Sequence, residues 1–206
     1  MAKLVKRNEI NDLCVKVSPF LLMIFKLDNV TSLTAARWAA AEGFDSISFN
    51  FDKSNPSYIQ PMQVAEICKW VSGIRFTGSF LNVESSVILD LYDLLNLDAI
   101  EIDLKTAEIL MNNDIPTIFC LEKNDFKSGL EFQKFNPHIF AFSLINETEL
   151  PFDFPIEKSF ISSKFENNIL QTIPFGISFN SANETEPGLI DFEELGISLN
   201  KWQKMA

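Results

Sequence analysis

The sequence predicts an α/β protein built as a (β/α)8 barrel, the TIM barrel, that forms a single domain over residues 1–206. Two observations support this fold class. Eight short apolar or β-rich runs recur at intervals of roughly 20 to 30 residues, with polar or helix-like segments between them. The length of 206 residues is at the lower end of what one such barrel needs, so a second domain is not expected.

Several of the eight candidate strands are nearly continuous apolar runs, as is typical of parallel strands that helices cover. They are Leu21–Leu27, Asp45–Phe51, Arg75–Leu81, Asp98–Asp103, Thr117–Glu122, Ile139–Ile145, Ser159–Phe165 and Gly176–Ser181. Residues 1–19 precede the first strand. We expect them to form an N-terminal extension, either a plug or a short helix beneath the barrel.

Helices are easiest to place in the first half of the chain. Thr31, Gln60-Pro61 and Asn82 are favoured at helix starts, and Gly43 and Gly73 are typical stops. The expected helices are Ser32–Glu42, Met62–Val71 and Glu84–Leu95. In the second half, the stretch 127–136 is short and 146–158 holds two prolines. One or two outer helices are therefore expected to be short or missing.

Composition excludes several classes of partner. The chain has 17 Lys plus Arg against 28 Asp plus Glu, a formal net charge of −11, which disfavours nucleic acid and anionic membranes. Its longest apolar stretch, Pro19–Phe25, is too short to span a bilayer, and the basic start lacks a signal-peptide core. Three widely spaced cysteines predict neither disulfides nor a zinc site and fit a cytoplasmic protein. No cofactor is expected, and His138 fits a loop histidine.

Short motifs follow one another in a consistent order. The first runs from Phe25 to Asn29 and leads into an alanine-rich helix that ends at Gly43. The others are Ser48–Phe51, Ser54–Ile59, Gly78–Asn82, Pro174–Ser178 and Glu184–Asp191. Together they resemble phosphoribosylanthranilate isomerases over most of the chain from residue 25 to 201. The resemblance implies the barrel fold and a reaction of tryptophan biosynthesis, the isomerisation of a phosphorylated ribosylamine.

The resemblance also assigns two catalytic positions, both changed in this chain. Asp28 stands where the family has its general base, a cysteine, and Asp103 stands where it has a histidine after strand four. A carboxylate at position 28 can still accept a proton. Its ordinary pKa of about 3.9 makes it a weaker base than a thiolate unless burial raises that pKa.

The family's acid and arginine are changed as well. Its general acid is an aspartate that ends strand six, and Ile145 or Asn146 occupies that position. A shifted alignment would instead bring Glu147 or Glu149 to the barrel mouth. The family's arginine corresponds to Ser57.

Phosphate binding in these barrels uses backbone N–H groups of glycine-rich loops after strands seven and eight. Ser163 and Lys164 replace two glycines of the seventh loop, and Asn180 and Ser181 precede Ala182, which replaces the glycine of the eighth. These side chains offer hydroxyl groups, an amide and one cation. We expect at most a rudimentary site for a small phosphorylated molecule.

Acidic residues also gather at predicted strand ends. Period-two geometry places Lys26 with Asp28, and Glu101 with Asp103, on one side of their strands. The resemblance implies that this side faces the barrel interior near its mouth. With Glu122, these carboxylates would form either a pocket for a divalent cation or a shared proton, or solvated loop ends without a function.

Three functions remain open. The leading hypothesis is a catalytically silent relative kept for binding or regulation, because base, acid, histidine, arginine and phosphate glycines have all changed. The alternatives are a working isomerase with Asp28 as base and a different enzyme with a metal at an acidic mouth. A homodimer is also expected, since short outer helices would leave apolar strand backs exposed. It would bury Phe126, Phe132, Phe135 or Phe152.

Overall fold

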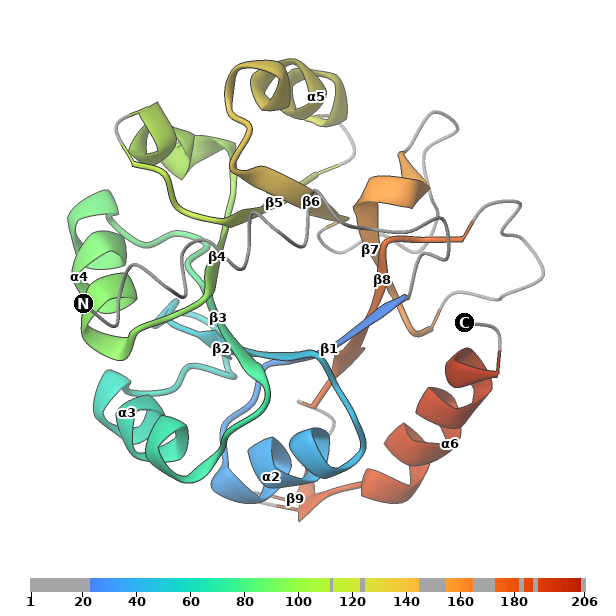
Figure 1. Ribbon diagram of the computed structural model, residues 1–206. Helices are drawn as coiled ribbons and strands as arrows, with labels where there is room; N and C mark the ends of the chain where they lie inside the picture. The colour runs from blue at the N-terminus through green and yellow to red at the C-terminus, as the bar shows by residue number, and fades with distance from the viewer. Residues whose placement is uncertain are drawn as a thin grey trace.

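Eight parallel strands close into a barrel in chain order in the computed structural model, with β8 completing the ring against β1 (Figure 1). The structure describes residues 23–111, 113–122, 125–144, 155–164, 173–181, 184–186 and 189–204. The strands are β1 (Ile24–Asp28), β2 (Ser46–Asn50), β3 (Arg75–Ser79), β4 (Ala99–Ile102), β5 (Thr117–Leu121), β6 (Ile139–Leu144), β7 (Ser159–Ser162) and β8 (Gly176–Asn180). Each predicted strand overlaps one of these, so the predicted (β/α)8 barrel is confirmed.

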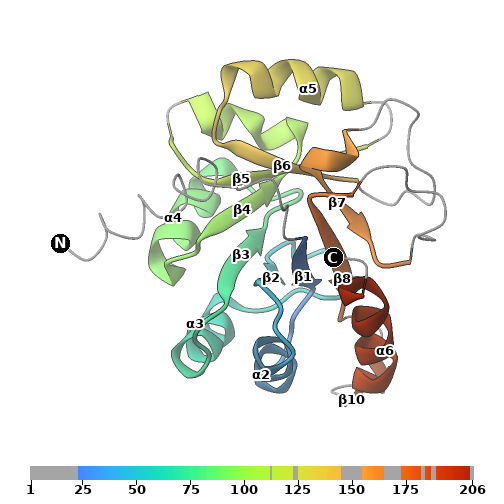
Figure 2. The same ribbon diagram turned by 45° about the vertical axis from the view of Figure 1, so that its right-hand side comes forward.

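Helices surround the strands, as Figures 1 and 2 show from two sides. They are α2 (Leu33–Ala41), α3 (Pro61–Trp70), α4 (Ser85–Leu95), α5 (Phe126–Phe135) and α6 (Phe192–Gln203), with the 3-10 helices η1 (Leu104–Met111) and η2 (Ile156–Lys158). After β8, β9 (Glu184–Glu186) and β10 (Leu189–Ile190) pair as a separate antiparallel ribbon. Outer helices are thus short or missing as predicted, but the clearest case is η1 after β4. After β5, α5 is a helix of 10 residues.

Two predicted helix starts are shifted. Ser32, not Thr31, caps α2, because its side chain accepts a hydrogen bond from a first-turn N–H at 3.2 Å. The N-cap of α4 is Glu84 rather than Asn82. Asn82 has a φ of 60°, which asparagine tolerates, and its side chain donates to Asp52 at 3.0 Å. It therefore fastens the loop before α4 to the loop after β2.

Apolar residues form two layers, one on each side of the strands. The larger lies between the strands and the helices, and there Phe119 of β5 stacks on Phe132 of α5 with ring centroids 5.6 Å apart. The smaller contains Ile118, Ala141 and Phe160. Each of these three lies two residues before another residue that lines the barrel mouth, so the smaller layer is the floor beneath the mouth.

Several predictions concern residues that the structure describes only in part. Residues 1–19, Phe152 and the side chain of Phe126 lie outside the described residues. Phe132 packs within its own chain, whereas Phe135 is 83% exposed. The homodimer therefore stays a prediction, with Phe135 as the described ring open to a partner. In the described part of the chain, no helix is long and apolar enough to cross a membrane.

Gly176 lies where β8 closes the barrel against β1 and β7. A Cβ atom there would lie 2.5 Å from the Phe160 ring and 2.6 Å from the Ile24 carbonyl oxygen. We expect Gly176→Ala to lower the free energy of unfolding by about 1–3 kcal/mol, because overpacking forces the neighbours apart. Urea unfolding followed by circular dichroism measures this.

The matched control is Gly196→Ala in α6, where a Cβ atom meets nothing within 4 Å. Alanine should stabilise this helix by roughly 0.5–1 kcal/mol. If Gly176→Ala were as stable as the wild type, the claim that an added Cβ atom overpacks the barrel closure would be contradicted.

Candidate functional site

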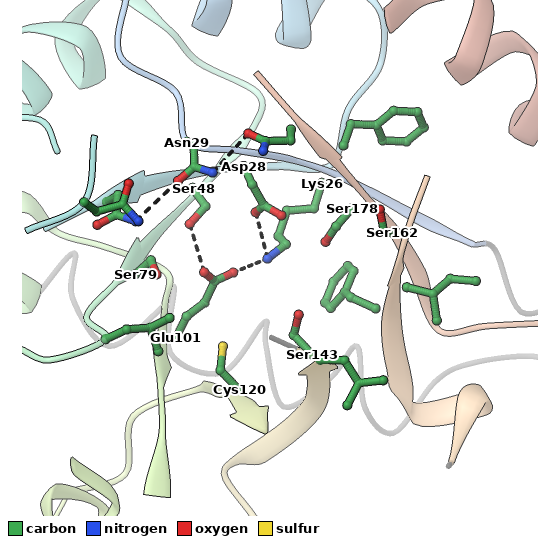
Figure 3. Close-up of a pocket in the computed structure, with 18 residues that line it drawn as sticks. Lys26, Asp28, Asn29, Ser48, Ser79, Glu101, Cys120, Ser143, Ser162 and Ser178 are labelled. Atoms are coloured by element: carbon green, nitrogen blue, oxygen red, sulfur yellow. Dashed lines mark hydrogen bonds and ion pairs between the residues drawn. The ribbon is translucent and has the colours of Figure 1, made fainter. Parts of the chain in front are cut away.

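A cavity of about 330 Å³ opens at the C-terminal ends of the barrel strands (Figure 3). All eight strands contribute to its wall, and most of the lining side chains are polar. The lining residues include Lys26, Asp28, Asn29, Ser48, Asn50, Ser79, Glu101, Cys120, Ser143, Phe160, Ser162, Ser178 and Asn180. Enzymes with this barrel use its C-terminal face for their active sites. The cavity is therefore the candidate site.

Lys26 on β1 lies between two carboxylates in the cavity wall. Its Nζ is 2.9 Å from Asp28 Oδ1 and also donates to Glu101 Oε1, which comes from β4 (Figure 3). The other oxygen of Glu101 accepts a hydrogen bond from the Ser48 hydroxyl at 3.2 Å. The side chains are 2% exposed for Lys26, 7% for Glu101 and 25% for Asp28. Lys26 is thus paired with both carboxylates, and Asp28 is the solvent-reachable member of this group.

Burial and neighbouring charges change the pKa values of three groups in the cavity. Burial opposes the positive charge of Lys26, but Asp28 and Glu101 outweigh it and raise the Lys26 pKa. Burial raises the pKa of Asp28 to about 6, with Lys26 opposing and Glu101 adding to the shift. Burial, and then Glu101, raise the pKa of the Cys120 thiol well above its ordinary value. At neutral pH the site holds an ammonium, a neutral thiol and a carboxylate close to its titration range.

Three asparagine side chains join the ends of β1, β2 and β8 at the cavity rim. Asn29 Nδ2 donates to Asn180 Oδ1 at 3.0 Å, and Asn50 Nδ2 donates to Asn29 Oδ1 at 3.3 Å. Asn29 has a φ of 58°, in the left-handed region that asparagine enters more readily than most residues. The buried Ser181 hydroxyl lies 2.8 and 2.6 Å from the carbonyl oxygens of Asp28 and Asn29. These bonds hold the chain at Asp28 in place.

The predicted cluster of four carboxylates is wrong in two members. The strand β4 ends before Asp103, and its carboxylate turns to accept hydrogen bonds from two N–H groups of η1 at 3.0 and 3.2 Å. Glu122 is exposed after β5, and neither side chain lines the cavity. Asp28 and Glu101 remain, with Lys26 between them. Within the described residues, no group of three or more His, Cys, Asp or Glu side chains is placed to hold a metal ion.

A second cavity of about 210 Å³ lies between the ends of β7 and β8 and the start of α6. Three of the residues predicted to bind phosphate line it, namely Ser163, Lys164 and Asn180. Ser181 lines neither cavity, because its hydroxyl faces the carbonyl groups after β1. The structure therefore brings three of the four predicted residues together.

Carboxylates face the same cavity from α6. Asp191 is the N-cap of this helix and accepts hydrogen bonds from the N–H groups of Glu193 and Glu194 at 3.1 and 3.0 Å. Asp191 and Glu194 both line the cavity beside Lys164. The N–H groups at a helix start attract anions, and here the protein's own carboxylate already uses two of them.

Serines are the part of the site that sequence reasoning missed. Ser48, Ser79, Ser143, Ser162 and Ser178 come from five different strands and line the main cavity. A signal was available in the alternation of polar and apolar residues along β2, where serine, serine and asparagine alternate with isoleucine and phenylalanine. By itself this alternation predicts a strand, and only the closed barrel shows that its polar side faces the cavity.

Other predicted positions lie away from the cavity or outside the described residues. The structure does not describe Ile145 and Asn146, which match the family's general acid. The nearby Glu147 and Glu149, and Ala182 of the eighth loop, also lie outside the described residues. Ser57, at the arginine position, is buried in the loop after β2 and does not line the cavity. His138 lies in the turn before β6, 3.0 Å from Asp114, as a loop histidine should.

Solved structures of known proteins share the fold of this chain. No family model matches it, and neither does any curated protein sequence. A structure of monomers of the dimeric phosphoribosylanthranilate isomerase from Thermotoga maritima superposes with a TM-score of 0.67 at 18% identity, covering 86% of this chain and 97% of that one. The isomerase from Thermus thermophilus gives 0.67 at 16%, covering 89% and 100%. The fold is that of phosphoribosylanthranilate isomerases.

One further isomerase structure holds a ligand. It was solved in complex with reduced 1-(o-carboxyphenylamino)-1-deoxyribulose 5-phosphate, and it superposes with a TM-score of 0.67 at 19% identity, covering 86% of this chain and 96% of that one. At identities this low, the superposition shows a shared barrel and nothing about shared chemistry. The chemistry of the site has to be argued from this chain's own residues.

Removing Lys26 should be costly, because it leaves two carboxylates in the cavity wall without their cation. We expect Lys26→Met to lower the free energy of unfolding by about 3–5 kcal/mol, measured by urea unfolding at pH 7. Lys69→Met on α3 is the matched control. Lys69 pairs with Glu66 at 2.6 Å, but these side chains are 64% and 60% exposed, so the change should stay within about 0.5 kcal/mol. Equal effects of the two substitutions would contradict a buried ion pair.

Asp28 should make stability depend on pH. Its pKa rises from 3.8 to about 6 on folding, so the folded protein binds this proton more tightly than the unfolded chain. Its contribution to stability is fully present below the unfolded pKa and is lost as the pH rises through about 6. Asp28→Asn cannot ionise at this position. Its free energy of unfolding, relative to that of the wild type, should therefore increase by about 1–3 kcal/mol as the pH rises from 4 to 7.

The charged or titratable groups that face this carboxylate are Lys26, Glu101 and Cys120. Carbon-13 NMR of the Asp28 carboxyl group gives the direct measurement, with a midpoint expected near pH 6. Glu122→Gln is the control in the unfolding experiment, since that exposed side chain lies outside the cavity. A midpoint near pH 4 for Asp28 would show that burial does not govern this group.

Proposed function

We propose that this barrel binds a small polar molecule at its C-terminal mouth and does not catalyse the isomerisation of the enzymes whose fold it shares. The observation that carries this proposal is the ion pair between Asp28 and Lys26. By resemblance, Asp28 occupies the position of the family's general base. That reaction needs a base, an acid and a phosphate clamp. Here the carboxylate is engaged by an almost fully buried ammonium.

A partner acid is also missing from the described wall of the cavity. Lys26 and Cys120 have raised pKa values, so both hold their protons tightly at neutral pH. Glu101 accepts hydrogen bonds from Lys26 and Ser48 at once. An efficient general acid has a pKa near the working pH. These groups support a binding role better than proton transfer to a leaving group.

The neighbouring cavity, at the place where the isomerases bind phosphate by resemblance, adds support. Its one described cation, Lys164, is accompanied by Asp191 and Glu194. Ser163 and Lys164 carry Cβ atoms where the family has glycines, which keeps the backbone N–H groups away from a phosphate oxygen. A phosphorylated substrate would gain little here.

Genetic complementation tests the proposal. A strain that lacks phosphoribosylanthranilate isomerase should not grow without tryptophan when it expresses this chain. The Thermotoga maritima isomerase, expressed from the same vector, is the positive control, and soluble expression of this chain is verified in the same cells. Growth at the rate of the positive control would overturn the proposal.

One observation favours a second candidate, a working isomerase with Asp28 as its base. The pKa of about 6 makes this carboxylate a better base than an ordinary aspartate. This alternative requires that the wild type restore growth, that Asp28→Asn abolish it, and that Glu122→Gln keep it.

A further inference from the structure

The main cavity has a lining that matches one class of ligand. We infer that it accepts a small polyhydroxylated amine without a phosphate group, such as an amino sugar. This inference rests on the binding function proposed above and specifies its ligand. The volume of about 330 Å³ lies within the range of roughly 300–1,000 Å³ typical of small-molecule sites.

The charge of the ion-paired group calls for a cation. Lys26 carries one positive charge, while Asp28 and Glu101 carry two negative charges when ionised, so one negative charge is unbalanced. Of the two carboxylates, Glu101 is 7% exposed and Asp28 is 25% exposed. A ligand can therefore reach Asp28. An ammonium group placed against it would balance the charge inside the cavity.

The hydroxyl groups of the wall call for a ligand with hydroxyl groups of its own. The Ser178 hydroxyl is buried, makes no direct hydrogen bond within the described part of the protein, and lies near enough to Asp28 to lower the pKa of that carboxyl group. Ser79, Ser143 and Ser162 line the same cavity from other strands (Figure 3). A hydroxyl group both donates and accepts, so neighbouring hydroxyls on a sugar ring complement such a wall. An unsatisfied buried hydroxyl also costs free energy that a ligand would recover.

Phosphate is disfavoured by the same residues. The two cavities share Ser162 and Asn180, so they are neighbours at the mouth. Their linings together hold two lysines and four carboxylates, which leaves two negative charges when all are ionised. A phosphate group would enter a negative field, whereas an amine would enter an attractive one.

Isothermal titration calorimetry at pH 7 with three probes tests the inference. The probes are glucosamine, glucose and glucosamine 6-phosphate, which differ by the amine and by the phosphate. We expect saturable binding of glucosamine, with an affinity about tenfold higher than for glucose, as one ion pair in a partly buried site provides. Glucosamine 6-phosphate should bind more weakly than glucosamine. NMR amide shifts on titration should centre on Asn29 and Ser178.

Two variants identify the group responsible. Asp28→Asn should remove the preference for glucosamine over glucose, while Glu122→Gln should keep it, since Glu122 is an exposed carboxylate outside the cavity. Thermal unfolding verifies that both variants fold. Tighter binding of the phosphorylated probe, equal affinity for glucose and glucosamine, or no saturable binding of glucosamine would each overturn the inference. Complementation by the wild type would instead contradict the proposed function. The preference for an amine would still be decided by the calorimetric titration alone.

Discussion

The ammonium group of Lys26 is the constraint on which the barrel mouth depends. An unpaired charge inside a protein is strongly unfavourable, so a lysine with a 2% exposed side chain has to be matched by carboxylates in its immediate surroundings. Asp28 comes from the same strand, but Glu101 comes from β4, 75 residues further along the chain. This pairing forms only when β1 and β4 take their places in one closed ring. The polar site therefore depends on barrel closure.

The register of the strands protects this arrangement. Successive side chains of a strand point to opposite faces, so a slip of one residue in β1 would turn Lys26 toward the helices and Phe25 or Leu27 toward the mouth. On the helix side of β1, Phe25 and Leu27 pack in an apolar cluster, where a lysine would meet no carboxylate partner. The apolar floor made by Ile118, Ala141 and Phe160 closes the cavity from below. The Lys26 Nζ atom also lies over the Phe160 ring, 5.0 Å from its centroid, and this cation–π contact favours the charged form of Lys26.

In this barrel, the residues that maintain the fold are separate from those that line the mouth. Its outer layer of phenylalanines, alanines and aliphatic residues maintains the architecture seen in the isomerases at 18% identity. The strand ends and loops determine what the mouth can bind. In this chain they present serines, asparagines and an ion-paired lysine, and the start of α6 is capped by Asp191. In the binding function proposed here, charge at the mouth rather than the fold selects the ligand.

The sequence by itself determined the strands and the fold class, because apolar runs such as Thr117–Glu122 and stop signals such as Gly43 are local properties of the chain. It also placed Lys26 and Asp28 on one side of β1 correctly, since alternation holds along a continuous strand. The same rule failed for Asp103, which lies one residue beyond β4 and caps η1 instead. Only the tertiary structure decided which strand ends meet. The contact of Lys26 with Glu101 depends on ring closure. Asp191 and Glu194, which line one cavity with Lys164, come from the start of a helix that follows β8, so no local pattern could have brought them together.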